Sequence, residues 1–271
     1  LSAALLHPGA RLLETRWNSF SRVDVLESPA VRTAPGLSLQ YADPLPPQLG
    51  LCVDGERMNA LTPVPEEIRG REELRFLSAL PASFPYYASS PKRVLILDPM
   101  GGVDVLTSLY YGAGETVILE TNPLIADLLR GRFASYSGNL YRRPDLRVEI
   151  GEARSFLKTG PAPFDLIVFP LTETAGASAS GLSGLREDYR LTVEAFRDYL
   201  DALSPEGFLS VQLYLLPPPR AELRLVSLAQ EALGRSGLAA PHHLMAIRSW
   251  GTFSLFVKKG RILPAEIETL K

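Results

Sequence analysis

The amino-acid sequence predicts an α/β protein: a mostly parallel sheet with a C-terminal antiparallel hairpin, preceded by a small N-terminal β lobe. Three observations predict this fold. From Lys92 onward, short apolar runs alternate with helical patterns, as in parallel strands joined by crossover helices. One of these runs leads directly into a Gly-Gly turn. The N-terminal part instead has short apolar runs with Pro and Gly between them. We therefore expect a β lobe at 1–62, a linker with a helix at 63–91 and an α/β domain at 92–271.

The N-terminal lobe is predicted from four apolar runs, RLLETRW, SRVDVLE, LSLQY and LGLCVDG. Pro35-Gly36 and the prolines at 44–47 separate them. Strands of this length, punctuated in this way, favour a small antiparallel sheet. In the linker that follows, the pattern predicts a helix over residues 71–79.

The first strand of the α/β domain is predicted at 93–97, because this run is apolar without interruption, as in a strand covered on both faces. Asp98-Pro99-Met100-Gly101-Gly102 follows. Glycines at a strand-to-helix turn permit positive φ and close approach of a ligand to the backbone. A helix predicted over 104–111 would point its N-terminal N–H groups at that ligand.

Two further strand ends carry acids. A strand at 116–119 places Glu120 at its end, roughly 20 residues after the glycine turn, where a carboxylate can accept hydrogen bonds from both ribose hydroxyls. A strand at 147–150 places Glu152 within reach of an adenine amino group. Taken singly, the turn could be only a tight turn, Glu120 a solvated strand-end acid and Glu152 an acid at a helix N-terminus. Their occurrence together and in order predicts a nucleoside site.

The remaining elements complete the sheet. A fourth strand is predicted at 164–169, and the loop after it should border the reacting end of the ligand. Small and polar residues at 172–184 suit either a lid over the site or a surface connection. The stripe of Tyr189, Val193, Phe196 and Leu200 indicates a core-facing helix side. Helices are predicted at 124–133, 153–158, 187–203 and 221–236, a strand at 207–215, and a hairpin at 244–257 around Trp250-Gly251.

The runs RVLILDPMGGVDVL, ILETNP, GEARSFL, FDLIVFPLTET and YRLTVEAFRDYLDALSPEGFLSV resemble the spermidine synthase family, within the Rossmann-like fold of class I S-adenosylmethionine-dependent methyltransferases. WNSFSRVDVLES, LCVDGERMNALTPV and IRSWGTFSLFVKKG resemble the members that bacteria join to membrane-spanning segments. The resemblance covers nearly the whole chain.

This resemblance implies a polyamine-type transferase whose co-substrate is decarboxylated S-adenosylmethionine or S-adenosylmethionine, and whose acceptor is a putrescine-like amine. It also implies Glu173 as the acid nearest the chemistry. The chain departs from the family in three places: Pro170 replaces the first of two aspartates after the fourth strand, the turn reads DPMGG, and the usual tyrosine-histidine pair before the first strand is missing. The donor-binding residues we expect are Asp98, Gly101, Gly102, Asp104, Glu120, Asn122, Glu152 and Ala153.

Two alternatives to aminopropyl transfer remain open. Methyl transfer from S-adenosylmethionine would require a partner for the amino-acid carboxylate, and N–H groups near Gly101 could supply one. A non-catalytic nucleoside-binding or assembly module is favoured by Pro170, because proline cannot act as a base.

Composition excludes some functions. The formal net charge of −2 argues against nucleic acid as the main partner. The single cysteine, Cys52, lies in an apolar run and is expected to be a buried structural thiol. The adjacent His242 and His243 would point to opposite faces of a strand, and we expect no metal site.

No apolar run reaches the roughly 18 residues that a membrane span needs. We expect a cytoplasmic location. Because the chain begins with Leu and opens with LSAALL, we also expect a covalent link to a membrane region upstream, which would make it the cytoplasmic domain of an inner-membrane protein. The family resemblance further implies a homodimer.

Overall fold

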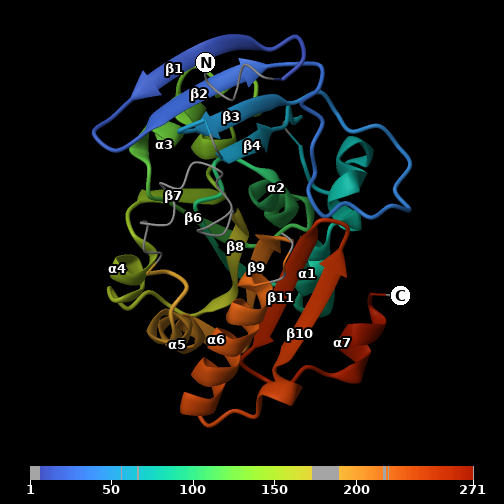
Figure 1. The fold of residues 1–271 in the computed structure, drawn as a ribbon, viewed down its shortest axis with the longest axis vertical. Coiled ribbons are helices and arrows are strands. Elements are labelled where there is room, and N and C mark those ends of the chain that lie inside the picture. The colour runs from blue at the N-terminus through green and yellow to red at the C-terminus, as the bar shows by residue number, and fades with distance from the viewer. Residues whose placement is uncertain are drawn as a thin grey trace.

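The computed structural model describes residues 7–55, 57–65, 67–172, 189–215, 218 and 220–270. These residues form two sheets, a four-stranded sheet in the order β1-β2-β3-β4 and a seven-stranded sheet in the order β10-β11-β9-β8-β5-β6-β7. Figure 1 shows the smaller sheet at one end of the molecule, next to α2 and α3, with α5, α6 and the β10–β11 hairpin toward the other end.

The N-terminal sheet is antiparallel throughout, as predicted. The prediction of a strand at LSLQY is wrong: the Tyr41 N–H bonds the Ser38 carbonyl in a turn, and the Ser38 N–H bonds Ala79. The fourth strand instead follows the third directly, because Asp54 (φ 56) and Gly55 (φ 72) adopt the left-handed conformations that a tight hairpin needs. The strands are β1 (Arg11–Trp17), β2 (Arg22–Glu27), β3 (Leu49–Val53) and β4 (Arg57–Leu61).

The seven-stranded sheet confirms the predicted α/β class. Its five central and edge strands β9, β8, β5, β6 and β7 pair in parallel, whereas β11 pairs antiparallel with both β9 and β10. The strand order reverses between β5 and β8, and α/β sheets bind ligands at the carboxyl ends beside such a reversal. The strands are β5 (Arg93–Leu97), β6 (Glu115–Glu120), β7 (Leu146–Ile150), β8 (Phe164–Thr172), β9 (Leu203–Tyr214), β10 (Leu244–Ser249) and β11 (Thr252–Lys258).

The helices match the predicted pattern with three differences. The helix expected at 71–79 is a 3-10 helix, η2 (Glu72–Ala79). The helix expected from 187 begins at Val193, where the Thr192 side chain caps it, so that Tyr189 precedes the helix and is exposed. Two short helices, α1 and α7, had no predicted counterpart. The helices are α1 (Phe84–Ser89), α2 (Val103–Tyr110), α3 (Pro123–Arg130), α4 (Ala153–Leu157), α5 (Val193–Ala202), α6 (Ala221–Arg235) and α7 (Pro264–Glu268).

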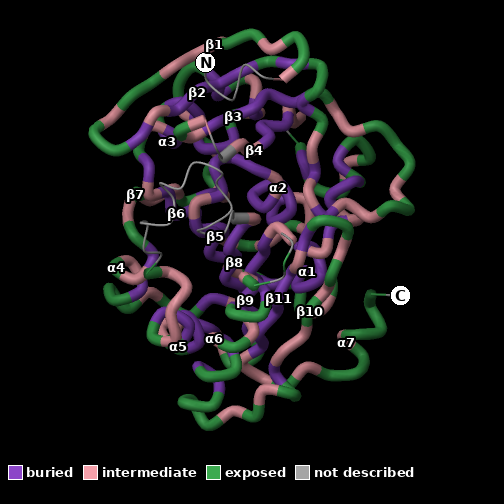
Figure 2. Tube along the Cα trace, viewed as in Figure 1, coloured by how far each residue is buried: buried purple, intermediate pink, exposed green. Residues whose placement is uncertain are grey.

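The core has two layers, one on each face of the large sheet. Val94 and Ile96 of β5 pack with α1, α2, α3 and the N-terminal sheet, whereas Leu95 and Leu97 pack with α4, α5 and α6. This alternation follows from the two-residue period of a strand. The central strands are accordingly buried along their length in Figure 2. Cys52 of β3 in the N-terminal sheet is also buried, as expected for a structural thiol. Burial raises the pKa of this thiol to about 11.

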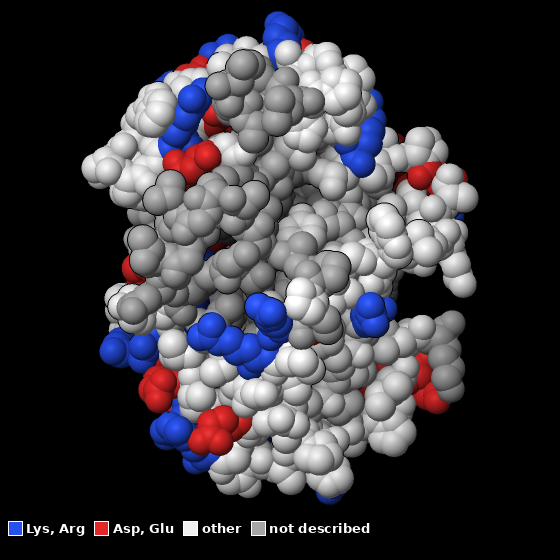
Figure 3. All heavy atoms as spheres, viewed as in Figure 1, with Lys and Arg blue, Asp and Glu red and all other residues white. Residues whose placement is uncertain are grey.

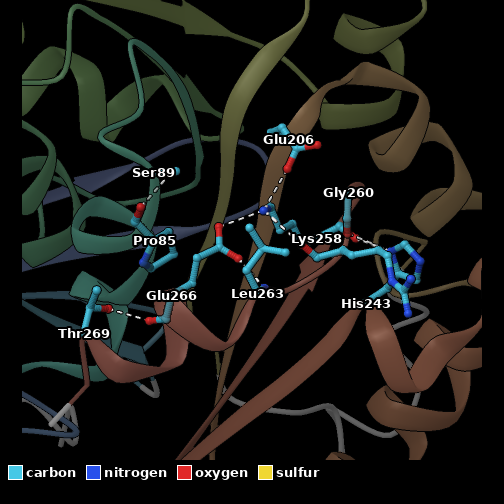
Figure 4. Close-up of polar contacts among 10 residues, drawn as sticks. Pro85, Ser89, Glu206, His243, Lys258, Gly260, Leu263, Glu266 and Thr269 are labelled. Atoms are coloured by element: carbon cyan, nitrogen blue, oxygen red, sulfur yellow. Dashed lines mark hydrogen bonds and ion pairs between the residues drawn. The ribbon is translucent and has the colours of Figure 1, made fainter.

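Ion pairs of the buried Lys258 hold the C-terminal helix (Figure 4). The Lys258 ammonium lies 2.7 Å from Glu266 Oε1 of α7 and 2.8 Å from Glu206 Oε2. Burial alone would lower the pKa of Lys258, but the two carboxylates more than offset it and the pKa is raised.

The two histidines do not lie in a strand as expected. His242 ends a 3-10 turn, and Nδ1 of the buried His243 lies 2.8 Å from the Gly260 carbonyl oxygen.

Candidate functional site

The turn between β5 and α2 has an unusual backbone. Asp98 (φ 52), Met100 (φ 53) and Gly101 (φ 67) all adopt positive φ. Non-glycine residues rarely do so, and strained backbone of this kind concentrates at functional sites. The sequence predicted left-handed conformations only at the glycines.

Hydrogen bonds within the protein use three consecutive N–H groups of this turn. The Met100 N–H donates to Glu120 Oε1 at 2.9 Å, and the Gly101 N–H donates to the Tyr141 hydroxyl at 3.0 Å. The Gly102 N–H donates to the Pro99 carbonyl at 2.8 Å. The turn is therefore held by its own surroundings.

Glu120 is completely buried at the end of β6. Besides the Met100 N–H, its Oε1 accepts a hydrogen bond from the Tyr141 hydroxyl. Burial, followed by the charge of Glu120, raises the pKa of Tyr141 well above its usual value. Glu120 thus fixes the glycine turn, a structural role that the sequence did not predict. Tyr141 was not predicted at all, because it lies in a 3-10 turn before β7 and belongs to no recognisable pattern.

The two glycines of the turn face protein atoms. A Cβ at Gly101 would lie 2.7 Å from Leu129 Cδ1 of α3. A Cβ at Gly102 would lie 2.9 Å from the Pro99 carbonyl oxygen. Positive φ and close packing therefore account for glycine at 101, and close packing alone accounts for it at 102. The interpretation as a tight turn has direct support.

Asp98 connects three segments. Its carboxylate accepts hydrogen bonds from the Thr121 N–H at 2.6 Å and the Thr121 hydroxyl at 3.0 Å. It also forms an ion pair with Arg190, whose Nη1 lies 2.8 Å from Oδ2. Both side chains of the pair are mostly buried, with 16% and 21% exposed for Asp98 and Arg190. A cation that the sequence did not predict thus lies beside the turn and offsets the charge of Asp98.

The N-terminal sheet contacts the site through amide side chains. Asn122 caps α3 by accepting from the Leu124 N–H, accepts from Asn18 Nδ2 at 2.9 Å and donates to the Ser21 hydroxyl at 2.8 Å. From β4, Asn59 Nδ2 donates to the Pro99 carbonyl at 2.8 Å. The lobe is therefore attached to the carboxyl ends of β5 and β6. Trp17 and Phe20, which flank this contact in the sequence, are exposed.

Glu152 and Ala153 lie at the neighbouring strand end. The Gly151 N–H donates to the Glu120 carbonyl at 3.0 Å, which brings the ends of β6 and β7 together. Glu152 is exposed at the N-cap of α4 and its side chain makes no capping hydrogen bond, whereas Ala153 is buried. Glu152 is thus the accessible acid at the end of β7.

Asp104 lies away from these acids. Its Oδ1 accepts a hydrogen bond at 2.9 Å from Gln212 Nε2, which belongs to β9 on the other side of β5 and β8. Burial raises the pKa of Asp104 to about 6, although the hydrogen bond from Gln212 opposes the rise. Pro170 is buried in β8. Glu173 lies outside the described residues.

The viewed face of the molecule carries charges of both signs. Figure 3 shows basic and acidic side chains interspersed on the viewed face, with a band of basic groups across its middle. In the ranges that the structure describes, no group of three or more His, Cys, Asp or Glu residues could hold a metal ion. No helix among the described residues combines the length and hydropathy needed to cross a bilayer.

The fold is that of spermidine synthases. A spermidine synthase in complex with the transition-state analogue AdoDATO superposes with a TM-score of 0.60 at 16% identity, covering 94% of this chain and 75% of that one. The Thermotoga maritima spermidine synthase superposes with a TM-score of 0.59 at 16% identity, covering 94% of this chain and 75% of that one. A probable spermidine synthase from Corynebacterium glutamicum superposes with a TM-score of 0.55 at 15% identity, covering 97% of this chain and 86% of that one. No protein-family model matches the sequence, and no curated protein does.

Proposed function

We propose that the chain binds an adenosyl sulfonium compound at the carboxyl ends of β5, β6 and β7 and transfers an aminopropyl group to an amine. One observation supports this above the others: Glu120 ends β6 and Glu152 follows the end of the adjacent parallel strand β7, beside the glycine turn, in the fold that spermidine synthases share. Carboxylates at these positions can accept hydrogen bonds from a ribose and an adenine.

The burial of Glu120 specifies how a ribose would bind. Because its Oε1 already accepts two hydrogen bonds, ribose hydroxyls would join or replace the Tyr141 hydroxyl as donors. Glu152, which is exposed, needs no such exchange. The predicted contribution of Glu120 to donor binding therefore includes holding the turn in shape.

The hydrogen bonds of the turn favour the decarboxylated donor. The amino-acid carboxylate of S-adenosylmethionine would need N–H donors near Gly101. The N–H groups of Met100, Gly101 and Gly102 are already bonded within the protein. A donor that lacks this carboxylate makes no such demand, and methyl transfer is therefore the less favoured variant.

The proposed reaction needs one proton acceptor. The neutral amine nitrogen would attack the carbon next to the sulfonium, the carbon–sulfur bond would break, and neutral methylthioadenosine would leave. The new ammonium would then give a proton to a carboxylate. Glu173 is the acid we propose for this step from the resemblance alone.

A non-catalytic module is the second candidate. Pro170 is buried at the end of β8, where the resembled family has an aspartate, and it can neither bind an ammonium group nor accept a proton. Arg190 also neutralises Asp98 beside the turn. Such a chain would retain nucleoside binding without turnover.

Product analysis separates these functions. The purified chain would be incubated with decarboxylated S-adenosylmethionine plus putrescine, and separately with S-adenosylmethionine plus mixed amines, with products read by mass spectrometry. Methylthioadenosine together with an aminopropylated amine is the expected result. S-adenosylhomocysteine would instead support methyl transfer. Methylthioadenosine binding by calorimetry without turnover would support the module, and absence of both would refute the proposed function.

A further inference from the structure

An ion pair joins the end of β5 to the segment that precedes α5. Asp98 directly follows β5, and Arg190 lies shortly before Thr192, the N-cap of α5. The Arg190 Nη1 atom lies 2.8 Å from Asp98 Oδ2, and both side chains are mostly buried. Breaking a pair of this kind is unfavourable, because each partner is left as an uncompensated charge away from water. The negative charge of Asp98 is therefore taken up within the chain.

The backbone of Arg190 is fixed on the other side of this pair. Its carbonyl oxygen accepts a hydrogen bond at 3.1 Å from the hydroxyl of Tyr199 in α5. The Tyr199 ring is buried and packs against Phe169 of β8, with the ring centroids 4.9 Å apart. Arg190 is thus attached to the β8 side through its backbone, and its side chain reaches the end of β5. The guanidinium group consequently has a defined position beside the glycine turn.

The order of the strands relates this pair to the proposed ligand. β5, β6 and β7 are parallel neighbours, so their carboxyl ends lie in that order along one edge of the sheet. The proposed function places an adenine at Glu152, beyond β7, and a ribose at Glu120, at the end of β6. The sulfur and its tail leave the ribose on the side opposite the base, and would extend toward the end of β5. There they would meet Asp98 and Arg190.

The charge of that tail differs between the donor and its product. Decarboxylated S-adenosylmethionine carries a sulfonium and an ammonium group, both positive, whereas methylthioadenosine is neutral. A cation beside the tail lowers the affinity for the donor through like-charge repulsion and has no such effect on the product. The Asp98 carboxylate could offset this repulsion, but Arg190 holds it. An ammonium group can therefore pair with Asp98 only by displacing the guanidinium group.

We infer that Arg190 is a specificity-determining residue: it competes with the ammonium tail for Asp98, so that the site binds neutral methylthioadenosine more tightly than the doubly charged donor. The inference rests on the proposed function, which supplies the position of the nucleoside. In a transferase, this preference makes methylthioadenosine a strong product inhibitor.

Calorimetry with the two nucleosides tests this role in the purified chain. Wild type should bind methylthioadenosine at least about tenfold more tightly than decarboxylated S-adenosylmethionine. Arg190→Gln keeps a hydrogen-bond donor for Asp98 but removes the charge. It should bind decarboxylated S-adenosylmethionine about tenfold more tightly than wild type does, with unchanged affinity for methylthioadenosine. Arg190→Lys, which retains the charge, should bind both ligands as wild type does.

Arg93→Gln is the matched control at the other end of β5. Arg93 is also mostly buried, and its Nε atom lies 2.7 Å from Glu115 Oε2. This variant should leave both affinities unchanged. The double variant Asp98→Asn, Arg190→Gln should lose the gain in donor affinity, because that gain depends on the Asp98 carboxylate. Circular dichroism of each variant checks that it is folded.

The salt dependence of binding gives a second measurement, which a purely structural role of Arg190 would not change. In Arg190→Gln, the affinity for decarboxylated S-adenosylmethionine should fall more steeply with NaCl concentration than in wild type, because salt screens the attraction of the cationic ligand to Asp98. Neutral methylthioadenosine should show no such dependence in either protein.

Several outcomes would overturn the inference. One is a wild type that binds either decarboxylated S-adenosylmethionine or S-adenosylmethionine as tightly as methylthioadenosine. Another is an equal change for both nucleosides in Arg190→Gln, which would indicate an altered turn rather than a lost charge.

If Arg190→Gln does not fold, Asp98→Asn gives the corresponding test. It leaves the charge of Arg190 unopposed and should weaken binding of decarboxylated S-adenosylmethionine alone, so an equal loss for both nucleosides would overturn the inference. Failure of wild type to bind methylthioadenosine would refute the proposed function itself, and the inference with it.

Discussion

The two halves of the site differ in how their acids are neutralised. On the β5–β6–β7 side, Glu120 accepts hydrogen bonds from Met100 and Tyr141, and Asp98 pairs with Arg190. On the β8–β9 side, Asp104 has only the Gln212 amide as a side-chain partner among the described residues. The first region is therefore held by contacts within the protein itself, whereas the buried Asp104 carboxylate lies beside a neutral amide.

Of the substitutions that test this comparison, replacing Glu120 should change the free energy of unfolding most. Glu120→Ala leaves the Met100 N–H and the Tyr141 hydroxyl without an acceptor in the core, and should lower the free energy of unfolding by about 3 kcal/mol. Urea denaturation measures this. Glu152→Ala is the matched control at the next strand end and should change stability by less than about 0.5 kcal/mol, because Glu152 is exposed. Equal stabilities would show that Glu120 acts only through a ligand.

Replacing Asp104 should change stability in the opposite direction. Because burial raises the pKa of Asp104 from 3.8 to about 6, the folded state favours its protonated form. Its contribution to stability is complete below the unfolded pKa and is lost as pH rises through 6. Asp104→Asn should therefore be more stable than wild type at pH 8 by about 2 kcal/mol, with no gain at pH 3. A stability difference independent of pH would contradict this account.

The connection between the lobe and the site should have a smaller effect. Asn122→Ala removes the cap of α3 and the contacts to Asn18 and Ser21, and should cost about 1.5 kcal/mol. Thermal unfolding with Asn122→Asp as a control would measure it, since aspartate keeps the cap but not the donor to Ser21. If both variants were as stable as wild type, the lobe would be attached by its apolar contacts alone.

Tyr141→Phe should have the smallest effect, about 1 kcal/mol, because it removes one hydroxyl and leaves the Gly101 N–H unbonded. The same variant sharpens the proposed mode of ribose binding. If ribose hydroxyls replace Tyr141 on Glu120, methylthioadenosine should bind the variant at least as tightly as wild type. Weaker binding by calorimetry would show that the Tyr141 hydroxyl is needed to position Glu120.

The sequence identified the parts of the site that directly follow a recognisable strand. The turn at Gly101, the acid at the end of β6 and the acid after β7 all follow apolar runs, and local pattern is sufficient to place them. Tyr141, Asn18 and Arg190 could not be predicted in the same way. Each reaches the site from a distant turn or loop, where no periodicity indicates which way a side chain points.

The sequence alone determined the sheet, the order of its acidic strand ends and the hairpin at Trp250, because strand periodicity and turn chemistry are local properties. Tertiary structure decided what those acids do. Only the packing of β9 beside β8 places Gln212 against Asp104, and only the packing of the turn before β7 places Tyr141 against Glu120. The charge state and role of a buried carboxylate depend on such neighbours. For Asp104, the neighbour Gln212 is more than a hundred residues away in the sequence.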